Sequence, residues 1–283
     1  MKFFHGCTAL ITGASSGLGV EFARQLAPDA HALVLVARRQ ERLQAIKTEL
    51  TRAHPDLSVY CYTLDLADMD ALERFTRWLS DEGIRINFLI NNAGCGDHGL
   101  FQSSDWHKVK AMLDVNIAAL TRMTYLLLPV LRTFEDSAIL NVSSSASFVP
   151  VPQMAVYAAT KAYVTSFSEA LRAELRGTGV SVTALCPGPV DTEFTEVASV
   201  GRGGSEFHAP EFFKVPPERV VLEALLGVER DRARVIPGWA VFLGLGLLCL
   251  IPFAFVRAGL NASVAGLHED EEKRQVASPR PVG

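Results

Sequence analysis

Tyr157 and Lys161 have the residue types and the spacing needed to move a proton to or from a carbonyl oxygen. The four-residue interval places both on one face of the helix that we expect from Val156 to about Arg176. A free tyrosine has a pKa of about 10, and a neighbouring ammonium group favours the phenolate. We therefore expect Lys161 to lower the pKa of Tyr157, which acts as general acid in reduction and general base in oxidation.

Two further polar residues complete a candidate catalytic set. Ser144 lies thirteen residues before Tyr157, directly after a short strand expected at 139–142. Its hydroxyl can bind the substrate oxygen and stabilise charge that develops there. Asn116 lies in a long helical stretch, where its amide either joins the site or only packs between helices. Lys161 has a second expected role, which is to bind the ribose hydroxyls next to a nicotinamide.

A glycine-rich turn near the start of the chain has the context of a phosphate-binding loop. The apolar run 7–12 has the pattern of a strand, three glycines follow it, and apolar residues then recur at helical spacing. Glycine lets a phosphate approach the backbone, and the N–H groups that begin a helix attract it. The spacing differs from the general dinucleotide fingerprint, so the turn alone could also be an ordinary tight turn. The residues expected to bind the cofactor here are Gly13, Ser15, Ser16, Gly17, Leu18 and Gly19.

The end of the second strand predicts a preference for NADP(H) over NAD(H). The apolar run 31–37 is followed by Arg38 and Arg39, with no carboxylate until Glu41. NAD-preferring proteins hold the ribose 2′-hydroxyl with an acidic residue near this point, whereas a guanidinium suits a 2′-phosphate. We expect Arg38 to contact the phosphate and Arg39 to stack near the adenine. The alternative is an arginine pair that is simply solvated at the start of a helix.

Two later strand ends carry residues where a nucleotide would lie. The apolar runs 60–64 and 87–90 are each followed at once by polar residues. Ligands of open α/β sheets bind beyond the carboxyl ends of the strands. We expect Asp65 to accept a hydrogen bond from the adenine amino group, although it could instead cap a helix or form a turn. The residues expected on the adenosine side are Asp65, Leu66, Asn92, Ala93 and Gly94.

Composition and the order of elements predict one α/β domain. The 283 residues alternate apolar strands with helical segments, which favours a Rossmann-type, doubly wound parallel sheet covered on both faces. The net charge of −4 offers no basic surface for nucleic acid. The five scattered cysteines suggest a reducing compartment, and neither a disulfide framework nor a metal site is expected. The chain enters its first strand within a few residues, so we expect no cleavable signal peptide and a cytoplasmic protein.

Together these motifs resemble those of the short-chain dehydrogenase/reductase family. The resemblance covers roughly residues 5–236, and the motifs occur in the family's order. Their positions are 12–19, 65–66, 91–94, 116, 144, 157–161 and 187–188. The motif set is specific for the family and says little about the substrate.

The resemblance implies roles for individual residues. Asn116, Ser144, Tyr157 and Lys161 would form a catalytic tetrad, with a water held by Asn116 through a backbone kink. The residues that would border the nicotinamide are Pro187, Gly188, Val190 and Thr192. Many NADP-preferring members carry a basic residue where this chain has Ser16, so the 2′-phosphate would rest on Arg38, Ser15 and Ser16. A homo-oligomer is also implied.

The C-terminal part departs from an ordinary catalytic domain. We expect the domain at 1–236, with a substrate loop at 192–217, then an apolar segment at 237–260 and a disordered tail at 261–283. The final strand is expected at Val235-Ile236, within an uncharged run of 22 residues, 235–256. About 20 apolar residues can cross a bilayer, but Gly and Pro residues interrupt this run. Three alternatives stay open: contact with a membrane surface through 237–256, a subunit interface or pocket wall, and a true span.

The sequence thus predicts a cytoplasmic NADP(H)-dependent oxidoreductase, with or without membrane association, that interconverts a ketone or aldehyde and an alcohol. The apolar loop and C-terminal segment favour a lipophilic substrate. Two alternatives use the same fold. An epimerase or dehydratase shares the Tyr/Lys pair but usually has a different glycine spacing and a larger C-terminal domain. A non-enzymatic NADP-sensing or scaffold protein typically lacks members of the tetrad, and all four are present here.

Overall fold

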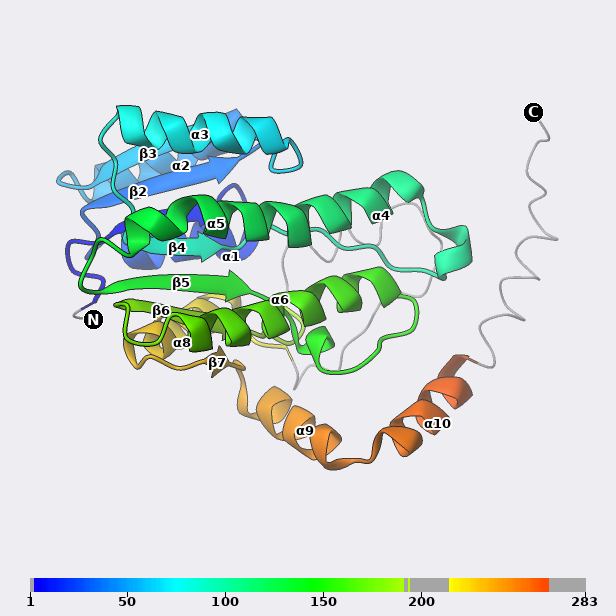
Figure 1. Ribbon diagram of the computed structural model, residues 1–283. Helices are drawn as coiled ribbons and strands as arrows, with labels where there is room; N and C mark the ends of the chain where they lie inside the picture. Colours follow the sequence, from blue (N-terminus) through cyan, green and yellow to red (C-terminus); the bar gives the residue numbers. More distant parts are fainter. Residues whose placement is uncertain (1–2, 191–192, 194–213, 265–283) are drawn as a thin grey trace, which may run out of the picture.

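The computed structural model describes residues 3–190, 193 and 214–264, and these form a seven-stranded parallel sheet in the order β3-β2-β1-β4-β5-β6-β7 (Figure 1). The strands are β1 (Thr8–Thr12), β2 (Ala32–Ala37), β3 (Ser58–Thr63), β4 (Phe88–Asn91), β5 (Ser137–Val142), β6 (Val180–Leu185) and β7 (Arg234–Val235). The order reverses direction at β1, and each neighbouring pair is parallel. This confirms the predicted doubly wound Rossmann-type fold.

Helices cover both faces of the sheet, as Figure 1 shows. One apolar core cluster lies under α1 (Gly17–Leu26), α2 (Gln40–Ala53) and α8 (Pro217–Glu229). The other lies under α3 (Met69–Asp81), α5 (Leu120–Leu131) and α6 (Ala155–Glu174). Strands between two helical layers have no polar face, which explains why β2 and β5 are buried at every residue. Because all strands are parallel, their carboxyl ends meet at one edge, and the predicted site residues follow those ends.

One long helical stretch crosses the front of the sheet. It consists of α4 (Trp106–Leu113), a π-helical turn η2 (Asp114–Ala119) and α5, and it contains Asn116 as expected. Within the described residues, 106–131 is the one helix long and apolar enough to cross a membrane. It is nevertheless a core helix, because Met112, Asn116, Met123 and Leu127 are buried in the domain.

The C-terminal segment forms two short helices beyond the last strand. The helices α9 (Trp239–Leu250) and α10 (Phe253–Val264) are separated at Ile251-Pro252 and leave the domain next to the carboxyl edge of the sheet (Figure 1). Each has 12 residues and measures about 18 Å, which is shorter than the roughly 30 Å hydrocarbon core of a bilayer. The expectation of a disordered tail from residue 261 is wrong for its first four residues, because α10 continues to Val264.

The helix α9 packs on the domain through one side only. Ala240 and Val241 are buried. The opposite side carries large apolar residues that are each more than half exposed, namely Trp239, Phe242, Leu243, Leu247 and Leu250. We call these five residues the outer face of α9.

Candidate active site

The glycine turn between β1 and α1 leaves no room for side chains where a phosphate would approach. Gly13 and Gly17 have φ values of +66° and +53°, which glycine adopts without strain. A Cβ atom on Gly19 would lie 2.3 Å from the carbonyl oxygen of Gly13 and 2.8 Å from Asn92 Nδ2. The turn is therefore a backbone cradle at a helix start, and it fits the pyrophosphate of a dinucleotide.

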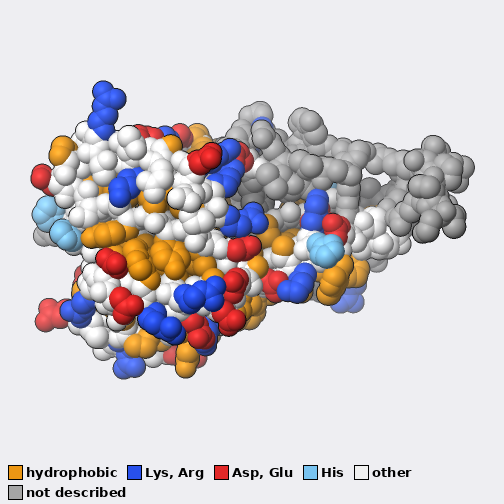
Figure 2. All heavy atoms as spheres, turned by 90° about the horizontal axis from the view of Figure 1, so that it is seen from above, with side chains coloured by type: hydrophobic (Ala, Val, Ile, Leu, Met, Phe, Trp, Pro, Cys, Tyr) orange, Lys and Arg blue, Asp and Glu red, His pale blue; other side chains and the backbone are white. Residues whose placement is uncertain are grey.

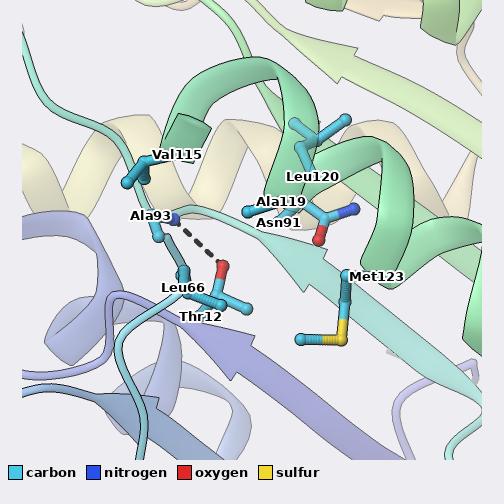
Figure 3. A pocket seen from close by; sticks show the side chains of 8 residues that line it. All are labelled: Thr12, Leu66, Asn91, Ala93, Val115, Ala119, Leu120 and Met123. Carbon is cyan, nitrogen blue, oxygen red and sulfur yellow. Dashed lines mark hydrogen bonds between the residues drawn. The ribbon is translucent and has the colours of Figure 1, made fainter. Parts of the chain in front are cut away.

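Thr12 connects this turn to the end of β4. Its Oγ1 accepts the N–H group of Ala93 at 3.0 Å (Figure 3) and that of Asn92, also at 3.0 Å. Asn92 Nδ2 in turn donates to the carbonyl oxygens of Thr12 (2.9 Å) and Gly13 (3.3 Å). Leu66 lines the same small hollow as Thr12 and Ala93. The structure thus brings these three predicted adenosine-side residues, Leu66, Asn92 and Ala93, directly beside the glycine turn.

Gly19→Ala is expected to lower the free energy of unfolding by about 1–3 kcal/mol, because the new methyl group overlaps the Gly13 carbonyl. Displacing this carbonyl also deforms the cradle, so the affinity for NADPH falls at least tenfold. Urea unfolding and fluorescence titration measure the two effects. Gly246→Ala is the matched control, since nothing lies within 4 Å of its Cβ position, and equal effects in both variants would contradict the prediction.

The structure brings Arg39, rather than Arg38, to the glycine turn. Arg39 Nε and Nη2 donate to Ser15 Oγ at 3.2 and 3.1 Å. Arg38 is exposed at the end of β2. Burial raises the pKa of the Cys95 thiol, and the positive charges of Lys161 and Arg38 oppose this rise. The guanidinium beside the turn therefore comes from the second residue of the predicted pair.

Two other predicted nucleotide contacts have local roles. Asp65 Oδ1 accepts the N–H of Ala67 at 3.0 Å, which is the turn that we considered as its alternative. Asp65 remains exposed at the carboxyl end of β3. Ser16 is the N-cap of α1, but its side chain caps no backbone N–H group.

The catalytic candidates Tyr157 and Lys161 lie buried in the first turns of α6. Their exposed fractions are 8 % and 4 %. Lys161 Nζ donates to the carbonyl oxygen of Val142 at 2.9 Å and lies 5.7 Å from the centroid of the Tyr157 ring. A Cβ atom on Gly94 would lie 3.3 Å from both Lys161 Nζ and Asn116 Oδ1, so these groups share one corner of the site.

Asn116 is held rigidly by the π-helical turn. Its Oδ1 accepts the N–H of Cys95 at 2.9 Å, and its Nδ2 donates to the Cys95 carbonyl oxygen at 2.9 Å. Nδ2 also donates to Thr160 Oγ1 at 3.0 Å, which links the long helix to α6. π-Helical turns are frequent at functional sites, and this one contains Asn116.

Ser144 lies where β5 ends and the short helix η3 (Ser145–Ser147) begins. Its Oγ accepts the N–H of Ala146 at 3.1 Å. Its hydroxyl also forms a hydrogen bond with the Tyr157 side chain that stabilises the phenolate. The structure therefore brings the two hydroxyl groups together at the carboxyl edge of the sheet.

The expected lowering of the Tyr157 pKa is wrong for this arrangement. Burial raises the pKa of Tyr157 to about 12, and the hydrogen bond with Ser144 only partly opposes this rise. The reason is geometric, because Lys161 Nζ is bonded to the Val142 carbonyl and not to the phenol oxygen. Burial also lowers the pKa of Lys161 to about 8. At neutral pH Tyr157 is thus protonated, which is the form that donates a proton during reduction.

Three of the four residues expected to border the nicotinamide, Pro187, Gly188 and Val190, lie within the described part of the chain. The carbonyl oxygen of Pro187 accepts the N–H of Ser145 at 2.8 Å, which holds this turn next to Ser144. Gly188 and Val190 are half-buried beside it. Thr192 lies outside the described residues, as does most of the predicted substrate loop 192–217.

A hollow next to Tyr157 is lined by residues that the sequence motifs did not indicate. It opens between the loop after β4 and the loop before α6. Its lining residues besides Tyr157 are Asp97, Gly99, Phe101, Ser104, Met112, Gln153, Met154, Ala155 and Val156. Loop residues of this kind follow no periodic pattern in a single sequence, so only the fold could reveal them.

Comparison with known proteins identifies the family. The profile of the short chain dehydrogenase family matches residues 7–201. The sulfoacetaldehyde reductase of Chromohalobacter salexigens is 41 % identical over 198 residues, which cover 68 % of this chain and 75 % of that protein. The NADP-dependent 3-hydroxy acid dehydrogenase YdfG of Escherichia coli K12 is 37 % identical over 200 residues, with coverages of 69 % and 77 %.

A solved structure agrees with the sequence comparisons. The short-chain dehydrogenase from Sphingobium yanoikuyae in complex with NADPH superposes with a TM-score of 0.74 at 33 % identity, covering 87 % of this chain and 96 % of the other. The matched region contains the glycine turn, Ser144, Tyr157 and Lys161. The chain therefore belongs to the short-chain dehydrogenase/reductase family, whose members use NAD(P) to oxidise CH–OH groups or to reduce the corresponding carbonyls.

Proposed function

We propose that this protein is an NADP(H)-dependent reductase that converts a lipophilic ketone or aldehyde to an alcohol, and that it catalyses the reverse oxidation. The observation that carries this proposal is the convergence of Ser144, Tyr157 and Lys161 at the edge of the sheet that also carries the glycine turn, with Lys161 and Asn116 beside Gly94. When bound, NADPH supplies the hydride for the carbonyl carbon.

The residues of the chain supply the remaining chemistry. The Ser144 hydroxyl donates a hydrogen bond to the carbonyl oxygen and stabilises its developing charge. Tyr157, protonated at neutral pH, transfers its proton to that oxygen. The Lys161 ammonium, held by the Val142 carbonyl oxygen at 2.9 Å, binds the ribose hydroxyls of the cofactor. Asn116, fixed between Cys95 and Thr160, holds this corner in place and supports proton supply to Lys161.

The side chains around the hollow beside Tyr157 favour a neutral, apolar substrate, and the hollow itself has room for about one water molecule. Phe101, Met112, Met154 and Val156 line it, and no Lys, Arg or His stands among the described residues that do so. Asp97, which is 6 % exposed, is paired with Lys108 at 3.3 Å, so its charge is balanced within the protein. A neutral, apolar substrate differs from the substrates in the names of two relatives, which are sulfoacetaldehyde and 3-hydroxy acids. It is in line with the bulky-bulky ketone specific alcohol dehydrogenase of Comamonas testosteroni, which is 28 % identical with a TM-score of 0.71.

The test is NADPH oxidation by purified protein on a panel of fatty aldehydes, quinones, 3-oxoacyl thioesters and steroid ketones, with matched oxo acids of equal chain length. Turnover on neutral carbonyls that exceeds turnover on the oxo acids is the expected result. Preference for the acids would contradict the substrate class but not the reaction. NADPH binding without any turnover would favour the sensing alternative.

We also propose that the protein is cytoplasmic and attaches to a membrane surface through the outer face of α9. Between Val235 and Val256 the only side chains able to donate a hydrogen bond are the Trp239 indole and the Cys249 thiol. An interface between two soluble proteins has a polar rim and about one hydrogen bond per 100–200 Å². A bilayer requires neither, and Trp is enriched at the level of lipid headgroups. Because both helices are too short to span, the segment lies on the membrane or dips into it.

Flotation with vesicles of phosphatidylcholine and phosphatidylglycerol tests this attachment. We expect wild-type protein to float with the vesicles and the variant Leu243→Glu/Leu247→Glu to remain in solution, with unchanged NADPH oxidation on a water-soluble aldehyde. The control is Leu222→Glu, an exposed apolar residue of α8 that should not affect flotation. The alternative outcome is that the wild-type protein does not bind vesicles and forms a dimer, whereas the double variant is monomeric. This result would identify the outer face as a subunit interface.

For the remaining partners we propose a homo-oligomer and no nucleic acid. Tyr125 of α5 and Tyr163 of α6 are exposed by 68 % and 37 %, which gives an aromatic surface on the front helices. Acidic and basic side chains are interspersed on the face seen in Figure 2, without a uniformly basic area. Light scattering after gel filtration checks the subunit number, and a monomeric mass would contradict the oligomer.

A further inference from the structure

We propose that Arg39 and Arg42 form a clamp for the ribose 2′-phosphate of NADP(H), and that the Glu193 carboxylate occupies this clamp until the phosphate displaces it. The inference rests on the proposed preference for NADP(H) and adds two residues, Arg42 and Glu193, that the sequence did not point to. Three separate segments meet here: the glycine turn, the start of α2, and the chain that follows β6.

The geometry of the clamp is that of an anion site already holding an anion. Arg39 Nη1 lies 3.1 Å from Glu193 Oε2, and Arg42 Nη1 lies 2.5 Å from Glu193 Oε1. Arg39 also donates to Ser15 Oγ in the glycine turn. The two guanidinium groups therefore bridge one carboxylate at the carboxyl end of β2, which is the place where the adenosine ribose lies in Rossmann-type folds.

A 2′-phosphate is the better ligand for this pair of guanidinium groups. It carries close to two negative charges and three acceptor oxygens, whereas the carboxylate carries one charge and two oxygens. Hydrogen bonds from Arg42 and Arg39 hold the pKa of Glu193 below its usual range, so the carboxylate stays ionised and competes at neutral pH. The side chains of all three residues are 41–47 % exposed, so each ion pair is weak and can be exchanged.

The arginine clamp favours NADP(H) over NAD(H), and competition by Glu193 reduces this preference. The 2′-hydroxyl of NAD(H) has no charge with which to displace Glu193 from the arginines. Glu193 therefore weakens NADP(H) binding by competition, while NAD(H) gains nothing from the clamp whether or not Glu193 occupies it. Arg42 is a specificity-determining residue in this arrangement, and Glu193 sets the affinity of the site.

The experiment measures dissociation constants by calorimetry, without turnover, for NADPH, NADH, adenosine 2′,5′-bisphosphate and 5′-ADP. For Glu193→Gln we expect about threefold to tenfold tighter binding of NADPH and of the 2′,5′-bisphosphate, with NADH and 5′-ADP unchanged. For Arg42→Ala we expect about tenfold weaker binding of the 2′-phosphorylated ligands. In the double variant, Glu193→Gln should add much less than it does alone, because the two residues act through one contact.

The matched control is Glu49→Gln. Glu49 pairs with Arg24 on the surface at a similar exposure, 48 % and 50 %, and is not part of the clamp. Unchanged affinities in Glu193→Gln, or an equal gain in Glu49→Gln, would overturn the role of Glu193. Equal affinities of wild-type protein for 2′,5′-bisphosphate and 5′-ADP would overturn the clamp itself. Failure of carbonyl reduction is a separate result, since these binding constants do not depend on any turnover.

Discussion

Tyr157→Phe is expected to lower kcat for carbonyl reduction by roughly 10²- to 10⁴-fold, which is the usual contribution of a positioned general acid. The ring remains packed beside Met112 and Val109, while the only lost group is the hydroxyl that meets Ser144. The dissociation constant of NADPH should therefore stay within about twofold of the wild-type value. Steady-state kinetics and a fluorescence titration give the two quantities.

Tyr163→Phe is the control for this experiment. Tyr163 lies on the same helix, but its hydroxyl bonds Thr121 Oγ1 near the surface at 3.0 Å, away from the site. Its kcat should match that of the wild type. If Tyr157→Phe kept more than a tenth of the wild-type kcat, another group would have to protonate the substrate oxygen.

Lys161→Met is expected to stabilise the fold while it lowers kcat at least 10²-fold. Burial lowers the pKa of Lys161 from its ordinary 10.5 to about 8, so its charge in the folded protein costs about 3 kcal/mol at neutral pH. Methionine fills a similar volume without a charge, so this cost is removed. Part of the gain in stability is lost again, because the Val142 carbonyl oxygen no longer has the ammonium group as hydrogen-bond partner. Urea unfolding at pH 7 should thus show a variant more stable by about 1–3 kcal/mol.

The pH dependence of the stability difference between wild type and Lys161→Met distinguishes the effect of the lysine charge from the effect of altered side-chain packing. Below about pH 8 both the folded and the unfolded wild type hold the proton, and the folded protein bears the full cost. Between pH 8 and about 10.5 the folded Lys161 is neutral while the unfolded chain still binds a proton, so wild-type stability rises relative to the variant. The gap between wild type and Lys161→Met should therefore shrink as the pH rises from 8 to 10. Lys110→Met, which removes an exposed lysine, should change stability by less than about 0.5 kcal/mol at every pH.

Local patterns predicted those parts of the molecule that depend on local forces. The strands were visible because a sheet covered on both faces requires continuous apolar runs, and β2 is buried throughout. Tyr157 and Lys161 were visible because their spacing matches the period of a helix. The doubly wound parallel sheet followed from the alternation of apolar strands and helical segments, and the position of Asn116 in a long helical stretch followed from helical periodicity.

The features that sequence reasoning missed depend on distance and burial. A phenol next to a lysine in sequence suggests a lowered pKa, but the sequence does not say that the Val142 carbonyl binds the ammonium. Arg38 and Arg39 are adjacent, and only the backbone direction at the start of α2 decides which of them reaches Ser15. Glu193 lies 151 residues from Arg42, so no pattern along the chain could connect them.

The position of α9 and α10 after β7 also determines when these apolar helices are translated relative to the strands of the sheet. β7 pairs with β6 and precedes α9, so every strand of the sheet has been translated before Trp239 is added. Domains fold as units, and exposed apolar surface is most dangerous while a chain is still incomplete. The outer face of α9 therefore emerges next to a sheet that can already be closed. A nascent chain released early, before residue 239, should consequently be more soluble than the 283-residue chain at the same concentration.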